Sequence, residues 1–592
     1  MSGPTEDLDQ AVIGQRIIDC CLREDIRGLS SQGQVHALPA HWRLPADITE
    51  ARHWLFIRHL GEEELVLPVH RASPMQAWSM LGDRWLCHRN DHIRVEQGYS
   101  RWLQRLSLDL DDETRQLFAA YQREADCAVE HRRLCAEAYG VHIARLERVL
   151  DAPGWDRRLL GIDQLASYLD HPFYPTARAK SGFDAKALQH YAPEFAPSFT
   201  LRWLAVPSAE MHLTSPVPTF WPSFADVGLN AELAASHSLL PVHPLTWTEL
   251  AQHGLPEHSV RAPLAFLQVE PTLSVRTVLC VDHPHWHFKL PLLVCTLGAR
   301  NLRLIKPSTL YDGYWFQRIL HSLSQRDPQL AGRYLHVDEQ HGGHAAEQRH
   351  LAYIVRRYPD HLASSTLVPV AALASPSSDG RLFLEQLAAR FHGGDLDAWL
   401  NEYLTLLLQV HLRLWLHYGI ALEANQQNAV LVFEASRPLR LLMKDNDAAR
   451  LWPQRFGAAC PDLAGQVHEL RDERIRVNDS QPLGEMFCTI TLQLNIVAVL
   501  EAMIARRLAP RAQLYGQLRQ CLHQTLAQLE SEGIDCLDAR RALLDNPHLP
   551  VKYLLSAGSL FSKARSGAHD INKFYGYSAR NFLLEDRPCH AD

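Results

Sequence analysis

The sequence predicts an α+β protein of several subdomains, with a helical N-terminal region, a mostly antiparallel sheet in the middle and a largely helical C-terminal region. First, the 592 residues exceed what one hydrophobic core can serve, so roughly two to four domains or subdomains are expected. Second, the apolar residues follow a helical period near both ends of the chain. Third, the middle is a series of short apolar runs separated by Pro and Gly, which is typical of strands.

The composition restricts the class of protein. With 46% hydrophobic residues, 21% charged residues and a net charge of -8, the chain is typical of a soluble globular protein, and nothing indicates disorder or a nucleic-acid partner. The acidic start "MSGPTEDLDQ" lacks the features of a signal peptide, and no uninterrupted apolar stretch reaches the roughly 18 residues of a membrane span. We therefore expect a cytoplasmic protein with no membrane partner. The 12 cysteines show no repeated Cys-x-x-Cys, so neither a zinc site nor a disulfide framework is expected.

The individual elements follow from local patterns. Residues 111–150 repeat apolar positions at spacings of three and four, which predicts a long helix packed on one face. From about 160 to 310, runs such as "SFTLRWLAVPSAEMHL" and "FKLPLLVCTLGARNLRLI" read as strands. Residues 393–418 form a second strong helical pattern, with Gly419 at the position of a C-terminal cap. The strands "NAVLVFE" and "PLRLLMKDND" follow, and the chain is then largely helical to about 545.

A polar loop after the second helix, "EANQQN", carries candidate metal ligands. The predicted strand pair brings Asn428 and Asp445 to the same end of a hairpin, with Glu423 close by in sequence. Such oxygen donors suit Mg²⁺, and protein kinases hold their metals from a comparable helix, loop and strand order. On the motif alone, the better interpretation is a structural one, in which the amides satisfy backbone groups in a turn.

Cationic residues in two apolar segments suggest an anion site. In "PTLSVRTVLC", alternation along a strand would place Ser274 and Arg276 on one face, where they suit a phosphate or carboxylate. Lys289 lies between apolar residues, where an uncompensated charge is costly, so an anionic ligand would compensate it. Arg303 is expected on a solvated strand face.

A third cluster, "DHPFYPTARAKSGFD", has two X-Pro pairs that enforce an extended backbone. Arg178 and Lys180 follow near a Ser-Gly turn, a reasonable anion-binding loop, although a solvated basic turn explains the pattern equally well. No P-loop, dinucleotide-binding turn or Gly-x-Ser-x-Gly elbow is present in the sequence.

Taken in order, these motifs resemble the IucA/IucC family, the aerobactin-synthetase-like enzymes that are also called NRPS-independent siderophore (NIS) synthetases. The stretch "HPFYPTARAKSG" matches a family motif, with Tyr174 at the place of its second His and two cations exchanged. The segments "YAPEF", "WLAV", "PVHP", "SVRT" and "KLPL" follow in family order, and "EANQQN" and "KDND" close the series, with Asn425 where the family usually has His. The resemblance covers about 160 to 450, with a weaker match around Lys552.

The resemblance implies a fold shaped like a cupped hand. On that plan, residues 1–155 form a helical thumb, 156–390 form sheet-containing fingers that bind ATP and the acid, and 391–592 form a helical palm with the metal and nucleotide loop. It also implies ATP-dependent ligation. A carboxylate of citrate, a citryl derivative or 2-oxoglutarate would be adenylated and then condensed with an amine, hydroxylamine or alcohol, releasing pyrophosphate and AMP. A homodimer is the implied assembly.

Carried over position by position, the resemblance implies roles for individual residues. Arg276, Lys289, Arg300 and Asn425 would be catalytic. The residues that would bind the cofactor ATP or the acid are Ser274, Arg276, Thr277, Lys289, Thr296, Asn428, His171, Arg178 and Lys180. Glu423, Asp445 and Asp447 would bind Mg²⁺. Asn425 can donate a hydrogen bond but cannot carry a positive charge as His does.

Two alternatives remain open from the sequence. One is a kinase-like phosphotransferase, for which ADP in place of AMP as the product would be diagnostic. The other is a relative that binds ATP and a carboxylate without turnover, for which Asn425 is the sequence hint.

Overall fold

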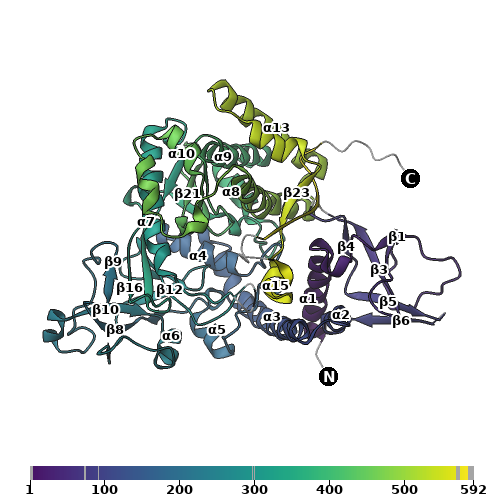
Figure 1. The fold of residues 1–592 in the computed structure, drawn as a ribbon, viewed down its shortest axis with the longest axis horizontal. Helices are drawn as coiled ribbons and strands as arrows, with labels where there is room; N and C mark the ends of the chain where they lie inside the picture. Colours follow the sequence, from purple (N-terminus) through teal and green to yellow (C-terminus); the bar gives the residue numbers. More distant parts are fainter. Residues whose placement is uncertain are drawn as a thin grey trace.

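The structure is a computed structural model that describes residues 4–72, 75–90, 92–296, 298, 301–435, 437–567 and 574–584. Figure 1 shows an elongated molecule, with the N-terminal sheet at one end of the long axis and the sheet of β8 and β10 at the other. The helices α7, α9 and α13 lie between these ends, toward the top of the view.

The N-terminal region is not purely helical, which corrects the prediction for this part of the chain. Between α1 (Pro4–Arg23) and the helix pair α2 (Tyr99–Leu106) and α3 (Asp112–Leu146) lies an antiparallel sheet of six strands. Its strands are β1 (Gln34–His36), β2 (His53–Ile57), β3 (Glu64–Arg71), β4 (Trp78–Met80), β5 (Arg84–Arg89) and β6 (His92–Gln97). They are short and rich in His and Arg, so their alternation is weak in the sequence, and the sheet is stabilised by packing against α1, α2 and α3. The predicted long helix is confirmed as α3, and Asp111 caps its start.

The middle of the chain forms the expected antiparallel sheets. The largest has seven strands in the order β7-β12-β13-β14-β17-β16-β9. These are β7 (Phe199–Thr200), β9 (Met211–Leu213), β12 (Gln268–Pro271), β13 (Thr277–Cys280), β14 (Trp286–Lys289), β16 (Asp338–Ala345) and β17 (Ala352–Arg357). A smaller sheet joins β10 (His237–Val242), β8 (Arg202–Pro207) and β11 (Val260–Arg261). The helices of this region are α4 (Trp155–Ser167), α5 (Ala185–Tyr191), α6 (Pro244–Glu249) and α7 (Pro307–Arg326).

A third sheet belongs to the C-terminal half. It has the order β15-β21-β20-β18, from β15 (Tyr334–His336), β18 (Thr366–Pro369), β20 (Ala429–Phe433) and β21 (Arg440–Met443). The predicted hairpin is confirmed, because Ala429 pairs with Met443 and the N–H of Lys444 donates to the carbonyl of Asn428 at 3.1 Å. The helix that precedes it is α9 (Leu396–Leu416), and Gly419 follows with a left-handed φ of 63°.

Helices complete the C-terminal half, as expected. They are α8 (Phe383–Phe391), α10 (Pro453–Ala459), α11 (Gln481–Met486), a π-helix (Phe487–Val497), α12 (Ala498–Ala505), α13 (Arg511–Ser531), α14 (Leu537–Arg540) and α15 (Lys563–Ser566). Two short strand pairs are added, β19 (Ile420–Ala421) with β22 (Arg450–Leu451) and β23 (His548–Lys552) with β24 (Tyr575–Arg580).

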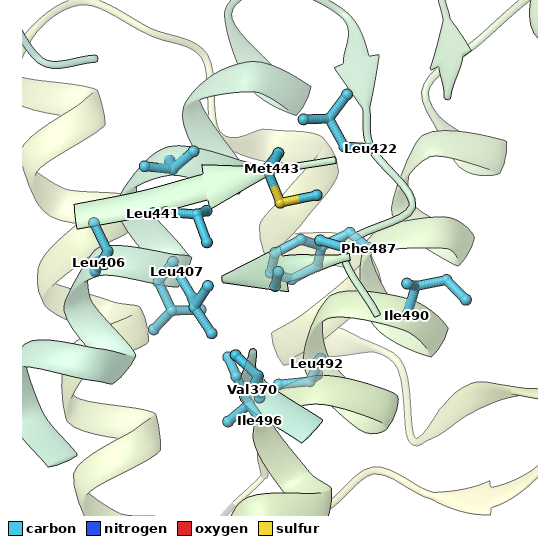
Figure 2. Close-up of a cluster of buried hydrophobic side chains, with 14 of the residues drawn as sticks. Val370, Leu406, Leu407, Leu422, Leu441, Met443, Phe487, Ile490, Leu492 and Ile496 are labelled. Carbon is cyan, nitrogen blue, oxygen red and sulfur yellow. The ribbon is translucent and has the colours of Figure 1, made fainter. Parts of the chain in front are cut away.

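The main core holds the hairpin of β20 and β21 in place. Figure 2 shows Leu441 and Met443 of β21 in one apolar cluster with Leu407 of α9 and Phe487 of the π-helix. The segment Gln481–Ala505 is long and apolar enough to cross a membrane by composition, but 78% of its most apolar window is buried inside the protein. It is therefore a core helix, and it anchors the strand that ends just before Asp445.

Candidate active site

A buried cluster of charges forms where the large sheet meets the end of β21. The Oδ1 atom of Asp445 accepts hydrogen bonds from Lys289 at the end of β14 and from Arg356 on β17, the latter at 2.7 Å. The backbone of Asp445 is left-handed, with a φ of 59°, a conformation that Asp adopts more readily than most residues. The sheet register brings the two cations together, because Lys289 pairs with Ile354, two positions before Arg356. Residues about 90 and 160 positions apart thus meet at one carboxylate.

Glu339 on β16 completes this cluster. Its Oε1 accepts from Nε of Arg356 at 2.7 Å and from the N–H of Asp445 at 3.1 Å, and its Oε2 accepts from the N–H of Asn446 at 3.3 Å. Burial raises the pKa of Glu339, although Arg356 opposes the rise. Burial would also raise the pKa of Asp445, but Arg356 and Lys289 outweigh it and hold that pKa well below its usual range. Asp445 is therefore an anion fixed by two cations.

The turn before β13 adds a further cation. Arg276 donates from Nη1 to the carbonyls of Arg303 and Leu304 at 3.2 and 2.9 Å, and its Nε has no partner within the described structure. Burial, reinforced by Arg303, lowers the pKa of Arg276 to about 9. Arg303 lies beside Arg276 and is not on the solvated face that was expected. The two guanidinium groups repel each other here, and an anion bound between them would reduce this repulsion.

The residues around Arg276 are not on a strand. The prediction that strand alternation places Ser274 and Arg276 on one face is therefore wrong. Ser274 and Arg276 lie in a turn, and β13 begins at Thr277. Val275 between them has a φ of 48°, an unfavourable value for a β-branched residue. The hydroxyl of Thr277 is buried and has no hydrogen-bond partner in the described part of the chain. A strained turn and unpartnered donors in one place are typical of a ligand site.

The charge of Lys289 is compensated by carboxylates of the protein itself, whereas the sequence predicted compensation by an anionic ligand. Besides Asp445, its Nζ lies 3.7 Å from Oδ1 of Asp447, so two carboxylates share one ammonium group. This donor set fits a divalent cation in chemistry, because carboxylate pairs are preferred Mg²⁺ ligands. Within the described residues, no group of three or more His, Cys, Asp or Glu side chains is arranged to hold a metal ion. Glu423, the third predicted ligand, interacts electrostatically with Arg303.

The loop "EANQQN" is organised by its amides. The Oδ1 atom of Asn425 accepts from the N–H groups of Gln427 and Asn428, both at 3.0 Å, and Nδ2 of Asn428 donates to the carbonyl of Glu423 at 3.0 Å. Asn425 thus closes an Asx turn, as the structural interpretation of the motif proposed. The hydrogen bond from the N–H of Lys444 to the carbonyl of Asn428 places the loop at the end of the hairpin that bears Asp445.

The third predicted cluster is occupied by internal ion pairs. Arg178 and Lys180 both contact Oε1 of Glu194, at 3.2 and 2.6 Å, and Arg178 also pairs with Asp170. Nδ1 of His171 accepts from the N–H groups of residues 173 and 174 at 3.2 and 3.0 Å, and burial lowers its pKa to about 3. These side chains tie the loop after α4 to its surroundings.

This loop also lies next to the segment of Thr296. Ser181 and Cys295 are joined by backbone hydrogen bonds, and the carbonyl of Thr296 accepts from Asn301 at 3.0 Å. Arg300, predicted as catalytic, lies outside the described residues.

Tyr174 has a structural position. Its hydroxyl is fully buried, donates to Oε1 of Glu124 on α3 at 2.8 Å and lies 2.9 Å from the hydroxyl of Ser559. The side chain thus joins α3, the loop after α4 and the C-terminal region.

Arg356 and Glu339 were missed by sequence reasoning. Arg356 ends the apolar run "AYIV" next to a second Arg, and alternation requires that one of the two face inward. That signal was available for Arg356. Glu339 stands among polar residues in "HVDEQHGGH", so its burial is decided by the pairing of β16.

Comparisons with known proteins agree with this architecture. Residues 159–375 match the profile of the IucA / IucC family, and residues 397–565 match that of the ferric iron reductase FhuF-like transporter. The staphyloferrin B synthase of Staphylococcus aureus (strain NCTC 8325 / PS 47) is 25% identical over 427 residues, 66% of this chain and 71% of that protein. The aerobactin synthase of Escherichia coli is 26% identical over 356 residues, 54% of this chain and 60% of that protein.

Solved structures share the fold over nearly the whole chain. The ATP-bound aerobactin synthetase IucA from a hypervirulent pathotype of Klebsiella pneumoniae has a TM-score of 0.69 at 18% identity, covering 97% of this chain and 99% of that one. The petrobactin biosynthesis protein AsbB from Bacillus anthracis str. Sterne has a TM-score of 0.72 at 14% identity, covering 98% and 96%. The profile match, the curated relatives and the shared fold agree with the resemblance of the sequence motifs. Residues 159–375 thus carry the IucA / IucC family profile, and nearly the whole chain shares the fold of these solved structures.

Proposed function

We propose that this protein is an ATP-dependent synthetase that adenylates a carboxylic acid and condenses it with an amine, hydroxylamine or alcohol to form part of a siderophore. The observation that carries the proposal is the cluster of cations around Asp445, where Lys289 and Arg356 donate hydrogen bonds to its carboxylate and Arg276 interacts with it electrostatically. The relatives named as siderophore synthases and the ATP-bound structure of similar fold support it.

The reaction would run in two steps. A carboxylate oxygen of the acid, such as citrate, a citryl derivative or 2-oxoglutarate, attacks the α-phosphorus of ATP, and pyrophosphate leaves with its bonding electrons. The nucleophile then attacks the acyl carbon, loses a proton and displaces AMP. Both steps gather negative charge on phosphate oxygens, so fixed cations in a buried site lower the barrier.

The chain's own residues would serve these steps by charge and position. Arg276 and Thr277 carry unpartnered donors and would bind phosphate oxygens, with Ser274 in the same turn. Lys289 would exchange a carboxylate partner for a phosphate oxygen when the nucleotide binds. Thr296 and Arg300 are proposed to contact the acid.

Asp445 and Asp447 would hold Mg²⁺, with Glu423 and Asn428 in the adjacent loop. The metal would supply charge neutralisation of the phosphates. The cytoplasmic location, the homodimer and the three-part division of the chain stay predictions.

Pyrophosphate release tests the proposal. Purified protein is incubated with ATP, Mg²⁺, citrate or 2-oxoglutarate and a panel of diamines, hydroxylamines and amino alcohols, and AMP and ADP are separated by chromatography. We expect pyrophosphate and AMP with at least one acid. ADP would indicate a phosphotransferase, and no release across a broad panel of acids would overturn the proposal.

Arg276→Ala tests the assignment of the site. We expect loss of pyrophosphate release with an unchanged circular dichroism spectrum, because the variant removes a phosphate-binding cation. Arg506→Ala is the matched control, since Arg506 is an exposed residue at the end of α12. Equal activity in the two variants would remove Arg276 from the site.

A further inference from the structure

A second cleft, separate from the charge cluster around Asp445, opens where α3 ends and α4 begins. Its volume is about 730 Å³, within the range of small-molecule sites. Four basic side chains line it, together with two acidic ones. The lining side chains that carry charge or can acquire it are His142, Arg145, Arg148, Asp151, Arg157 and Glu270.

Two of the guanidinium groups are held in position, and the third has no partner in the described part of the chain. Nη2 of Arg145 donates to the buried Gln164 at 2.8 Å, and Nη1 of Arg157 donates to Glu270 at 2.8 Å. The side chain of Arg148 forms no hydrogen bond or ion pair with any described residue. Each guanidinium group has five N–H donors, so most donors at this cleft are not used by the protein.

The acidic residues of the cleft are already neutralised. Asp151 pairs with Arg390 at 2.9 Å, and Glu270 pairs with Arg157. Arg145 and Arg148 are left without a carboxylate partner among the described residues. An excess positive charge therefore faces a concave space, which raises the local concentration of anions.

Helix α4 separates this cleft from the charge cluster around Asp445. Gly161 and Gln164 line the cleft, and a Cβ on Gly161 would lie 2.5 Å from Val149, so the floor is closed by close packing of α4 against the turn after α3. Asp163 between them interacts electrostatically with Lys444, the residue before Asp445. One helix thus borders two sites on different faces.

We propose that this cleft binds a small multivalent oxyanion, either a polycarboxylate or a phosphate compound. The ligand would be held by the guanidinium groups of Arg145, Arg148 and Arg157, because guanidinium groups bind carboxylate and phosphate oxygens through paired N–H donors. The site is distinct from the one that would hold ATP, so it does not depend on the proposed function.

Titration calorimetry with the full chain tests the proposal. Citrate and pyrophosphate are the probes and acetate is the monovalent control, each at low and at physiological salt. The experiment is run on the wild type and on Lys289→Ala, which weakens anion binding at the other site. In each background, Arg148→Glu and Arg148→Gln are compared with Arg506→Glu. Arg506 is also exposed and next to a helix end, and its side chain has no hydrogen bond or ion pair with the residues that the structure describes.

We expect Arg148→Glu to weaken the binding of one probe by about tenfold or more, Arg148→Gln to weaken it less, and Arg506→Glu to leave it unchanged. Tighter citrate binding identifies a polycarboxylate ligand, and tighter pyrophosphate binding identifies a phosphate ligand. Equal affinities of Arg148→Glu and Arg506→Glu, or no binding of either probe, would overturn the proposal. A lower melting temperature of Arg148→Glu with unchanged binding would also overturn it, because the arginines would then only stabilise the C-terminus of α3.

Discussion

Replacing Arg356 by Met should destabilise the protein through the buried carboxylate that it leaves behind. The side chain of Arg356 is 2% exposed, and it bridges Glu339 and Asp445 with two hydrogen bonds of 2.7 Å. Asp445 keeps Lys289 as a partner after the substitution, whereas Glu339 loses the one ion pair that it forms among the described residues. The uncompensated group is therefore Glu339.

The expected loss of stability is about 3–5 kcal/mol, the cost of removing one partner of a buried ion pair. Adding Glu339→Gln should restore part of it, because Gln removes the buried charge and keeps an oxygen for the N–H groups of residues 445 and 446. We expect the double variant to be more stable than Arg356→Met alone by about 1.5–3 kcal/mol.

The pH dependence has a defined sign. The pKa of Glu339 is raised in the folded protein, and removing Arg356, which lowers it, raises it further. A raised carboxyl pKa means that the folded state binds more protons than the unfolded state, so stability is present at low pH and is lost as pH rises through the folded pKa. Arg356→Met should therefore lose less stability at pH 5 than at pH 8.

Urea unfolding followed by tryptophan fluorescence measures these differences. The control is Arg357→Met on the same strand, since Arg357 pairs with Asp360 at the surface and should contribute less than about 1 kcal/mol. The reasoning is refuted if Arg356→Met unfolds at the same urea concentration as Arg357→Met, or if Glu339→Gln gives no relief.

Other substitutions test single contacts. Asn425→His should leave the urea midpoint unchanged, because Nδ1 of His can accept hydrogen bonds from the same two N–H groups, as Nδ1 of His171 does in its own turn. Asn425→Leu removes the acceptor and should lower the free energy of unfolding by about 1 kcal/mol. Equal urea midpoints for the two variants would contradict the role of Asn425 in the turn. Burial lowers the pKa of His243 to about 3, so the folded state binds fewer protons than the unfolded state and stability falls as pH drops below about 6.5. His243→Asn keeps an acceptor for the N–H of residue 245 and should reduce that fall by up to about 1.4 kcal/mol per pH unit. Parallel curves of stability against pH for the wild type and the variant would show that His243 does not cause the fall. Tyr174→Phe should cost about 1–3 kcal/mol by removing a hydrogen bond to buried Glu124, and an unchanged thermal midpoint would show that this bond contributes nothing.

Local patterns predicted the elements whose signals lie within a few consecutive residues. The helix at 396–416, its Gly419 cap and the hairpin of β20 and β21 combine strong periodicity with a clear turn residue, and all are present. The N-terminal sheet was missed because its short strands obtain their stability from the helices packed on them. The turn at Val275 was missed because a β-branched residue with positive φ is held there by its surroundings against its own preference.

The order of the motifs along the chain was enough to indicate the family resemblance and to predict polar site residues, because each motif is a short run of consecutive residues. The charge state of that site depends on contacts between distant strands. Lys289 looked uncompensated beside its sequence neighbours, and it is Asp445, 156 positions later, that neutralises it. Arg356 and Glu339 join the cluster through the pairing of β14, β16 and β17. That pairing cannot be read from the residues next to them in the sequence. A buried charge is stable only with its partners, so the tertiary structure decides which of these residues are paired and which remain available to a ligand.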